Sequence, residues 1–425
     1  MTMPYVETLR FRQQELPDKF YFKNQKQKNN MKHQQLLQEF SRARLKIAIV
    51  TETWPPEING VAMSLMQLCK GLQKQGHKIL LIRPKQKHQC VEFTPNKECL
   101  VTAQAVPKYP DMRFGWPQYL KVSQALAAFT PDVVHIVTEG PLGFTALHAA
   151  KVKRIPVSSG FHSPFQEFSR FFDLAFLVKP IQRYLKWFHN NTQLTCVPSV
   201  DTERALREFG VTCPLHVVGR GVDVEKFSAT HRSEQVRKAW AVDNETRVLL
   251  YIGRLSPEKE IHVLIDAYLA MRKQAQNVKL VIVGDGPDRG RLEKIPGAEQ
   301  VLFTGSLSGV HLAQAYASAD VFVFASQVET FGNVVLEAMA SGLPVVAYNY
   351  ASMQLYIKHQ QTGWVCPLGA TDQFIQHILQ LPDNTALHRM GQLAMQDVQN
   401  IGWQHAVQQF EQALYQVTQH QVLVT

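Results

Sequence analysis

The stretch VLLYIGRLSPEKEIHVLIDAYLAM, residues 248–271, decides the fold of this chain. An apolar run ends at Gly253, and a helical pattern over residues 263–271 follows a short polar loop. A glycine at the end of a strand, Ser256 as an N-cap and Pro257 at the first helical position are typical of a sharp turn from strand to helix. The stretch therefore predicts one strand–loop–helix unit of a parallel α/β sheet.

The same alternation extends over most of the chain. From Lys46 onward, short β-branched runs alternate with longer helical patterns, which indicates βαβ units and parallel sheets. A first series of strands is expected at residues 46–51, 78–82, 133–137, 156–158, 194–197 and 215–218, with helices over 61–75 and before residue 131. A second series is expected at residues 247–252, 279–283, 301–303, 321–324 and 344–347. The sequence thus predicts two doubly wound, Rossmann-like sheets.

Five parts follow from this pattern. We expect a basic extension over residues 1–44, a first domain over 45–219, a linker over 220–243, a second domain over 244–400 and a C-terminal helix over 401–425 that packs back on the first domain. The extension has nine Lys and Arg residues against four Asp and Glu, and its centre lacks apolar periodicity. Such a segment is expected to be mobile. Translation from either Met1 or Met31 is consistent with the sequence.

The composition narrows the class of protein. The 425 residues are 45% hydrophobic and carry a net charge of +10, which favours a globular protein that binds the phosphates of a nucleotide, a nucleic acid or a lipid surface. No signal-peptide pattern and no apolar run of 18 residues occurs, so we expect a cytoplasmic protein. The absence of a C-x-x-C pair predicts reduced thiols at Cys69, Cys90, Cys99, Cys196, Cys213 and Cys366.

The loops that follow the expected strands are candidate sites, because ligands of parallel sheets bind beyond the carboxyl ends of the strands. The loop over residues 51–61 contains Gly60, which allows backbone N–H groups at a helix N-terminus to approach an anion. In the loop over residues 253–259, Arg254 and Lys259 can both face a diphosphate at the start of the next helix. Taken singly, each loop is better explained as an ordinary solvated connection.

Two further loops contain acidic or histidine side chains. The motif ETFGNVVLE, residues 329–337, has a glutamate at each end, and Glu337 lies on an otherwise apolar helix. A carboxylate there is costly to bury unless it is hydrogen-bonded, and sugar hydroxyls would supply such bonds. His162 follows the expected strand 156–158 in a Gly/Ser/Pro loop. The structural alternatives are a helix-dipole contact for Glu329 and a satisfied structural histidine.

Together, these loops resemble family 4 glycosyltransferases, which have the GT-B fold of two Rossmann-like domains facing each other across a cleft. The resemblance extends from Leu45 to about Phe410, and its most specific element is the spacing of Glu329 and Glu337. The residues that occur in the family's order and spacing are Gly253, Arg254, Lys259, Glu329, Phe331, Gly332, Asn333 and Glu337.

The resemblance implies a retaining hexosyltransferase that uses a nucleotide-diphosphate sugar. Arg254 and Lys259 would hold the diphosphate and stabilise charge on the leaving phosphate. Glu337 would bind the ribose hydroxyls, Glu329 the transferred sugar, and His162 would lie near that sugar.

The resemblance also implies same-face attack, with the leaving diphosphate as the base. Gly60 would contact the phosphates. No protein nucleophile, cofactor or divalent metal is required in this family, and the sequence has no D-x-D motif or cluster of metal ligands.

Within the family, residues 51–61, 138–143 and 220–223 resemble the branch of GDP-mannose-dependent α-mannosyltransferases and of sulfoquinovosyl- and glucosyl-diacylglycerol synthases. This branch favours GDP-mannose as donor, then UDP-glucose or a related UDP-sugar, and a lipid or glycolipid acceptor. Arg220 stands where many relatives have Asn. Glu260 stands where they usually have a small residue or Asn, and it adds negative charge beside the expected anion.

Residues 168–189, FSRFFDLAFLVKPIQRYLKWFH, suggest how the acceptor is reached. After Pro180, apolar residues recur at helical spacing, and the basic and aromatic residues of the segment are Arg170, Phe171, Phe172, Lys179, Arg183, Lys186 and Trp187. A basic amphipathic helix with an aromatic edge is typical of a membrane interface, which predicts peripheral binding to the anionic inner face of the plasma membrane. The alternative is a core helix that packs its apolar stripe on the sheet.

Three other functions are compatible with parts of the sequence. A nucleotide-sugar epimerase or a sugar phosphorylase could share the two-domain architecture, and a transferase could use a soluble or polysaccharide acceptor. Binding of nucleic acid is disfavoured, because the sequence has no helix-turn-helix, zinc-finger or RNP pattern.

Overall fold

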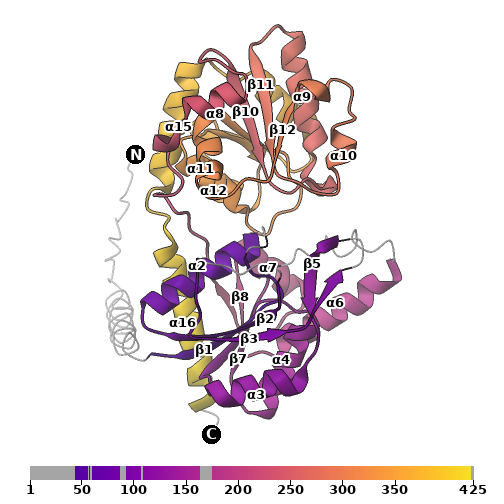
Figure 1. Cartoon of the computed structure of the whole chain (residues 1–425), viewed down its shortest axis with the longest axis vertical. Helices are drawn as coiled ribbons and strands as arrows, with labels where there is room; N and C mark the ends of the chain where they lie inside the picture. The colour runs from indigo at the N-terminus through magenta and orange to yellow at the C-terminus, as the bar shows by residue number, and fades with distance from the viewer. Residues whose placement is uncertain are drawn as a thin grey trace, which may run out of the picture. The chain divides into compact units, whose positions relative to one another are not determined.

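The computed structural model describes residues 44–55, 57, 60–86, 92–106, 109–162 and 175–422 (Figure 1). Within these ranges the chain forms two parallel sheets, of seven and six strands, and one antiparallel pair. The α/β fold class expected from the sequence is confirmed.

The first sheet has the strand order β3-β2-β1-β6-β7-β8-β9. Its strands are β1 (Lys46–Val50), β2 (Lys78–Pro84), β3 (Lys97–Val101), β6 (Val133–Ile136), β7 (Val157–Gly160), β8 (Leu194–Val197) and β9 (Leu215–Val217). Its helices are α2 (Gly60–Lys74), α3 (Tyr119–Phe129), α4 (Pro141–Val152), α6 (Ala175–Asn190), α7 (Val200–Phe209) and the C-terminal α16 (Trp403–Val422). Helix α16 packs against α2 and against β6, β7 and β8 of this sheet.

The second sheet has the strand order β12-β11-β10-β13-β14-β15. Its strands are β10 (Arg247–Ile252), β11 (Val278–Val283), β12 (Leu302–Gly305), β13 (Val321–Phe324), β14 (Val345–Tyr348) and β15 (Gly363–Cys366). The α-helices of this half are α8 (Glu234–Ala239), α9 (Ile261–Lys273), α10 (Arg289–Leu292), α11 (Gly309–Ser318), α12 (Asn333–Ala340), α13 (Ala351–Tyr356), α14 (Thr371–Leu379) and α15 (Asn384–Val398). Short 3-10 helices lie at Ala229–His231, Pro257–Lys259 and Ala298–Gln300.

Apolar periodicity explains most of these elements. In β10, the run from Val248 to Ile252 is buried, because β11 and β13 pair with it on both sides. Helix α9 buries Ile261, Leu264, Ile265, Tyr268 and Met271 at helical spacing, which matches the pattern seen in the sequence. Every strand expected from the sequence is present, with ends that differ by at most two residues.

Three features of the strands were not predicted from the sequence. Strands β3 and β15 are sheet edges, and the pair β4 (Ala103–Val106) and β5 (Tyr109–Gly115) is antiparallel. Strand β3 contains a lysine and a glutamate, and β15 has only four residues and begins with glycine. Short or charged edge strands have a weak apolar signal, so they are hard to detect by pattern.

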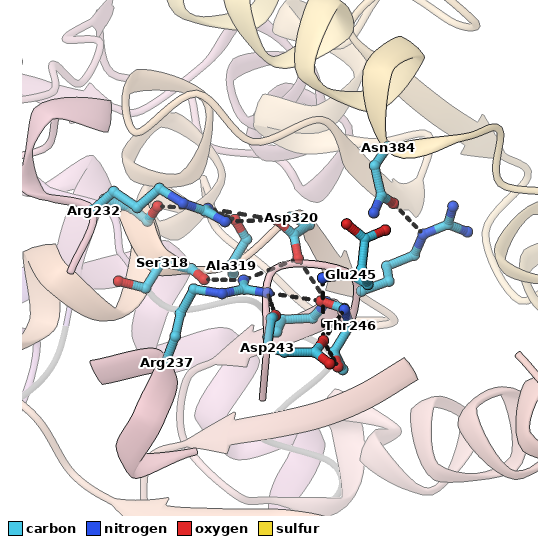
Figure 2. Close-up of polar contacts among 12 residues, drawn as sticks. Arg232, Arg237, Asp243, Glu245, Thr246, Ser318, Ala319, Asp320 and Asn384 are labelled. Carbon is cyan, nitrogen blue, oxygen red and sulfur yellow. Dashed lines mark hydrogen bonds and ion pairs between the residues drawn. The ribbon is translucent and has the colours of Figure 1, made fainter. Parts of the chain in front are cut away.

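The segment that follows β9 is held on the second sheet by a buried arginine (Figure 2). Arg237 of α8 is 1% exposed and donates to Ser318 O at 2.9 Å, Thr246 O at 2.8 Å and Asp320 Oδ2 at 3.2 Å. Asp320 also accepts from the backbone N–H of Val248 at the start of β10. A buried charge of this kind is tolerated because a carboxylate and several carbonyls surround it.

The described cysteines are buried and free: Cys69, Cys99, Cys196, Cys213 and Cys366. Cys90 lies outside the described residues.

Candidate functional site

The loop after β10 is packed tightly against the loop after β11. The backbone N–H of Gly253 donates to Val283 O, and that of Leu255 donates to Asp285 O, both at 3.0 Å. Gly284 has φ +140°, and a Cβ there would lie 1.9 Å from Gly253 O. Only glycine permits both this backbone conformation and this close approach.

We expect Gly284→Ala to destabilise the protein by about 2 kcal/mol and to reduce activity, because the added methyl group displaces the loop that contains Arg254. Thermal unfolding measures the first effect. Gly290→Ala is the matched control, since Gly290 lies on α10 and a methyl group added there would meet nothing within 4 Å. Equal melting temperatures for the two variants would contradict this account.

Arg254 and Lys259 lie at the two ends of a rigid turn. The Tyr251 hydroxyl, at the end of β10, donates to Arg254 O at 2.9 Å. Ser256 and Pro257 begin a 3-10 helix over Pro257–Lys259, and the longer helix α9 starts separately at Ile261. Both basic residues are partly buried, beyond the carboxyl end of β10.

Lys259 and Glu329, 70 positions apart in the chain, form an ion pair. Lys259 Nζ donates to Glu329 Oε1 at 2.7 Å, to Val328 O at 3.0 Å and to Ser326 Oγ at 3.3 Å. Both side chains are about 15% exposed. From the sequence, Lys259 was expected to hold the diphosphate and Glu329 the transferred sugar, and in the structure the two side chains lie side by side.

Glu337 lies on α12, which begins after Gly332 at φ +87°. Its Oε2 atom accepts a hydrogen bond from the buried Tyr316 hydroxyl at 2.9 Å. Burial raises the pKa of the Glu337 carboxyl, while the Tyr316 bond and the nearby Lys226 charge oppose this rise. One oxygen is thus engaged by Tyr316, and the other can accept a bond from a ligand hydroxyl.

Glu260, which stands where the resemblance implies a small residue or Asn, has an unusual backbone conformation. Its φ of +46° lies in the left-handed region, which favours Gly and Asn. The carboxylate accepts from Gln327 Nε2 at 2.6 Å and from the Tyr348 hydroxyl at 3.3 Å. These two bonds fix the position of the Glu260 carboxylate.

In the first sheet, His162 follows the carboxyl end of β7 and lies next to Arg220. Arg220 Nη2 lies 3.1 Å from His162 Nδ1. Burial, then Arg220 and then the neighbouring His135 and His189, hold the pKa of His162 well below its usual value. A guanidinium can only donate, so Nδ1 is the acceptor and the ring proton lies on Nε2. His162 is therefore a neutral hydrogen-bond donor at the sheet edge.

Gly60 is the exposed first residue of α2, and a Cβ added there would meet nothing within 4 Å. The first turn of α2 has no acidic residue, so the helix N-terminus is available to an anion. One turn further, Ser64 Oγ accepts from Asn333 Nδ2 at 2.9 Å. This bond joins the second turn of α2 to the first residue of α12.

Two glutamates beside this edge were missed in the sequence. Glu52 follows β1 and accepts from the Leu142 N–H at 2.9 Å; burial raises its pKa to about 7, against the Leu142 bond and with a smaller contribution from Glu139. Glu139 follows β6, and its Oε1 atom lies 3.2 Å from His189 Nε2. Both residues follow strands just as His162 does, and that shared position is the signal that could have identified them.

Helix α6 combines a buried stripe with an exposed basic edge. Leu185 and Phe188 are buried, so the core-helix alternative is right for the stripe, whereas Trp187 is 46% exposed. Phe144 on α4, also 46% exposed and missed in the sequence, lies 5.9 Å from Trp187 between ring centroids. The exposed basic residues of α6 are Lys179, Arg183 and Lys186. Arg170, Phe171 and Phe172 lie outside the described residues.

Two properties of the described part of the chain bear on metals and membranes. No group of three or more His, Cys, Asp or Glu side chains there could hold a metal ion. Among the same residues, no helix is long and apolar enough to span a bilayer.

Comparisons of the sequence and of the structure with known proteins both find glycosyltransferases or proteins of the same fold. Residues 58–226 match the family described as Glycosyltransferase Family 4, and residues 232–396 match the family described as Glycosyl transferases group 1. Among solved structures, sucrose-phosphate synthase from Thermosynechococcus elongatus has a TM-score of 0.72 at 20% identity, over 89% of this chain and 100% of that chain.

Three curated relatives span most of the chain. A GDP-mannose-dependent alpha-mannosyltransferase of Mycobacterium tuberculosis is 33% identical over 80% of this chain and 87% of its own length. The sulfoquinovosyl transferase SQD2 of Arabidopsis thaliana is 28% identical, over 87% and 73%. An alpha-monoglucosyldiacylglycerol synthase of Streptococcus pneumoniae is 26% identical, over 75% and 74%.

Proposed function

The chain belongs to glycosyltransferase family 4 and is a nucleotide-sugar-dependent hexosyltransferase, and from this premise we propose that it transfers mannose from GDP-mannose to a lipid or glycolipid hydroxyl with retention of configuration. The observation that carries the donor assignment is the 33% identity to a GDP-mannose-dependent enzyme over 80% of the chain. UDP-glucose or a related UDP-sugar is the second candidate. The name of the diacylglycerol-modifying relative supports a lipid acceptor.

In the proposed reaction, the acceptor oxygen forms a bond to the anomeric carbon as the bond from that carbon to the diphosphate breaks on the same face. The acceptor proton passes to the leaving phosphate oxygen. Arg254 and Lys259 stabilise the charge that develops on the diphosphate. Glu337 orients the ribose, and Glu329, which is held by Lys259, orients the sugar. His162 donates from Nε2 to the sugar or to the phosphate beside it.

A panel of GDP- and UDP-sugars, scored for turnover with extracted membrane lipid as acceptor, tests this proposal. We expect GDP-mannose to give the highest rate and a lipid-soluble product. A parallel incubation without acceptor separates transfer from epimerisation, since an epimerase converts the sugar without releasing it. Turnover with soluble glycans and none with lipid would refute the acceptor assignment.

We define the α6 face as Lys179, Arg183, Lys186, Trp187 and Phe144. It combines exposed positive charge with paired aromatic rings, as expected of a surface that binds anionic lipid headgroups while its rings enter the interface. Each basic residue near such a surface contributes about 1 kcal/mol. We therefore propose that this face brings the enzyme to its lipid acceptor.

Flotation with vesicles that contain anionic lipid tests the α6 face. We expect the wild-type protein to bind at low salt and to dissociate at high salt. Changing Lys179, Arg183 and Lys186 to Glu should lower binding at least about tenfold. The matched control changes Lys238, Lys273 and Lys294, exposed residues of the other half, to Glu. Equal loss in both triple variants, or no binding by wild type, would refute the face.

A further inference from the structure

Arg220 is a buried cation without an acidic partner among the described residues. It is 8% exposed. Its guanidinium donates to Val218 O and Gly219 O, both at 3.3 Å, and to His162 Nδ1 at 3.1 Å. These contacts engage three of the five N–H groups of an arginine. Burial lowers the pKa of Arg220 to about 10, so the side chain is still charged at neutral pH.

The other buried arginines in the described part of the chain are paired with carboxylates. Arg237 donates to Asp320 at 3.2 Å, and Arg83 donates to Glu98 at 2.9 Å. A charge removed from water is unfavourable unless an opposite charge or several strong hydrogen bonds compensate it. Among the described residues, Arg220 has two long bonds to carbonyls and one to a neutral imidazole, which supply little of this compensation.

The described residues that line the cavity beside Arg220 carry no negative charge. Arg220 and His162 line a small, largely apolar cavity with His135 and with Val61 and Ser64 of α2. His135 is buried, and this burial lowers its pKa to about 3, so it is neutral. The lining also includes one face of α2, from Val61 to Leu68. A guanidinium and a neutral N–H donor thus converge, with no acid of the described residues among the cavity's lining.

The cavity also lies next to the donor-side residues. Ser64, one of its lining residues, accepts from Asn333 Nδ2. The other amide atom, Asn333 Oδ1, is buried and has no hydrogen-bond partner among the described residues. Asn333 begins the helix that contains Glu337 and follows the loop that contains Glu329. Arg220 therefore lies where the two sets of candidate residues meet.

We propose that Arg220 binds an anionic oxygen group of a substrate, beside His162. The group is either a phosphate of the donor's diphosphate or an acidic group on the acceptor; the inference rests on the proposed glycosyl transfer. Binding of this anion supplies the charge compensation that the described residues do not provide.

Nucleotide affinity distinguishes the two sources of the anion. By calorimetry, we expect Arg220→Gln to bind GDP and UDP about 10- to 100-fold more weakly than wild type if the diphosphate is the anion, with affinity for GMP and UMP changed less than about threefold. If the acceptor supplies the anion, nucleotide affinity stays constant. The preference for an acid-bearing over a neutral acceptor lipid then falls by about tenfold or more.

Stability separates this role from a structural one. Arg220→Gln removes an uncompensated charge, so its melting temperature should equal or exceed that of wild type, whereas Arg237→Gln, which breaks a compensated pair, should melt lower.

Arg220→Lys should keep part of the nucleotide affinity because it keeps the charge. Arg207→Gln is the matched control, since exposed Arg207 also donates to two carbonyls, and it should bind nucleotides like wild type.

Two results would overturn the inference. One is an Arg220→Gln protein that melts lower than wild type with unchanged nucleotide affinity and acceptor preference. The other is equal weakening in Arg220→Gln and Arg207→Gln. Because the binding arm needs no turnover, these outcomes differ from failure of the proposed function, which would appear as a wild-type protein that binds no nucleoside diphosphate.

Discussion

Lys259→Ala is expected to lower the rate of sugar transfer about 100-fold or more. The ammonium group faces the proposed diphosphate and also holds Glu329 in position at 2.7 Å. Losing a charge contact of about 3 kcal/mol in the transition state accounts for an effect of this size. Steady-state kinetics with the best donor of the panel measure it, and Arg254→Ala should give a loss of similar size.

The ion pair makes the Lys259 prediction sharper. Because Lys259 acts partly through Glu329, the double variant Lys259→Ala/Glu329→Ala should be much less impaired than the product of the two single losses. Lys273→Ala, at the exposed end of α9, is the matched control and should transfer sugar at the wild-type rate. A folded Lys259→Ala enzyme with near wild-type kcat/KM would show that the site lies elsewhere.

Glu337→Ala is expected to reduce transfer about 100-fold as well, through loss of the ribose contact. The Tyr316 hydroxyl engages one carboxylate oxygen, so Tyr316→Phe should cause a smaller loss, of about tenfold, by loosening the same group. Both variants should raise the KM for the donor. Glu299 is an exposed residue in the same half, so Glu299→Ala is the control. It should leave the rate of transfer and the KM for the donor unchanged.

Modified donors show whether Glu337 acts on the ribose. With a nucleotide sugar whose ribose lacks the 2′ and 3′ hydroxyls, the wild-type rate of transfer should fall. It should then differ from the rate of Glu337→Ala by less than about threefold. If the variant is equally impaired with both donors, Glu337 contacts another part of the substrate. Circular dichroism must show both proteins folded, because removing a half-buried carboxylate also leaves Tyr316 without a partner.

Local patterns were sufficient for the secondary structure around the site. The apolar run before Gly253 and the helical spacing after it predicted β10 and α9, because burial on a sheet follows directly from such spacing. The apolar helix around Glu337 was likewise recognised, since its start is marked by Phe331-Gly332-Asn333. Edge strand β3 was missed because two of its five residues are charged.

The partners of the site residues were not predictable from the same patterns. Lys259 was expected at a phosphate, yet in the structure it binds Glu329. Arg220 was regarded only as a departure from the usual Asn, although it contacts His162. Phe144 escaped notice on a helix of unremarkable sequence, and its exposure beside Trp187 became clear only from the packing of α4 and α6.

From sequence alone come the two Rossmann-like sheets, the loops at their carboxyl ends and the basic and acidic residues on those loops. This is possible because helical and strand periods are local, and parallel strands expose their carboxyl ends at one edge. Tertiary structure alone decided that Lys259 pairs with Glu329, that Tyr316 supports Glu337 and that Arg220 is buried without an acid among the described residues. Hydrogen bonding and the cost of a buried charge depend on distances between residues remote in the chain, and those distances exist only once the sheets are assembled.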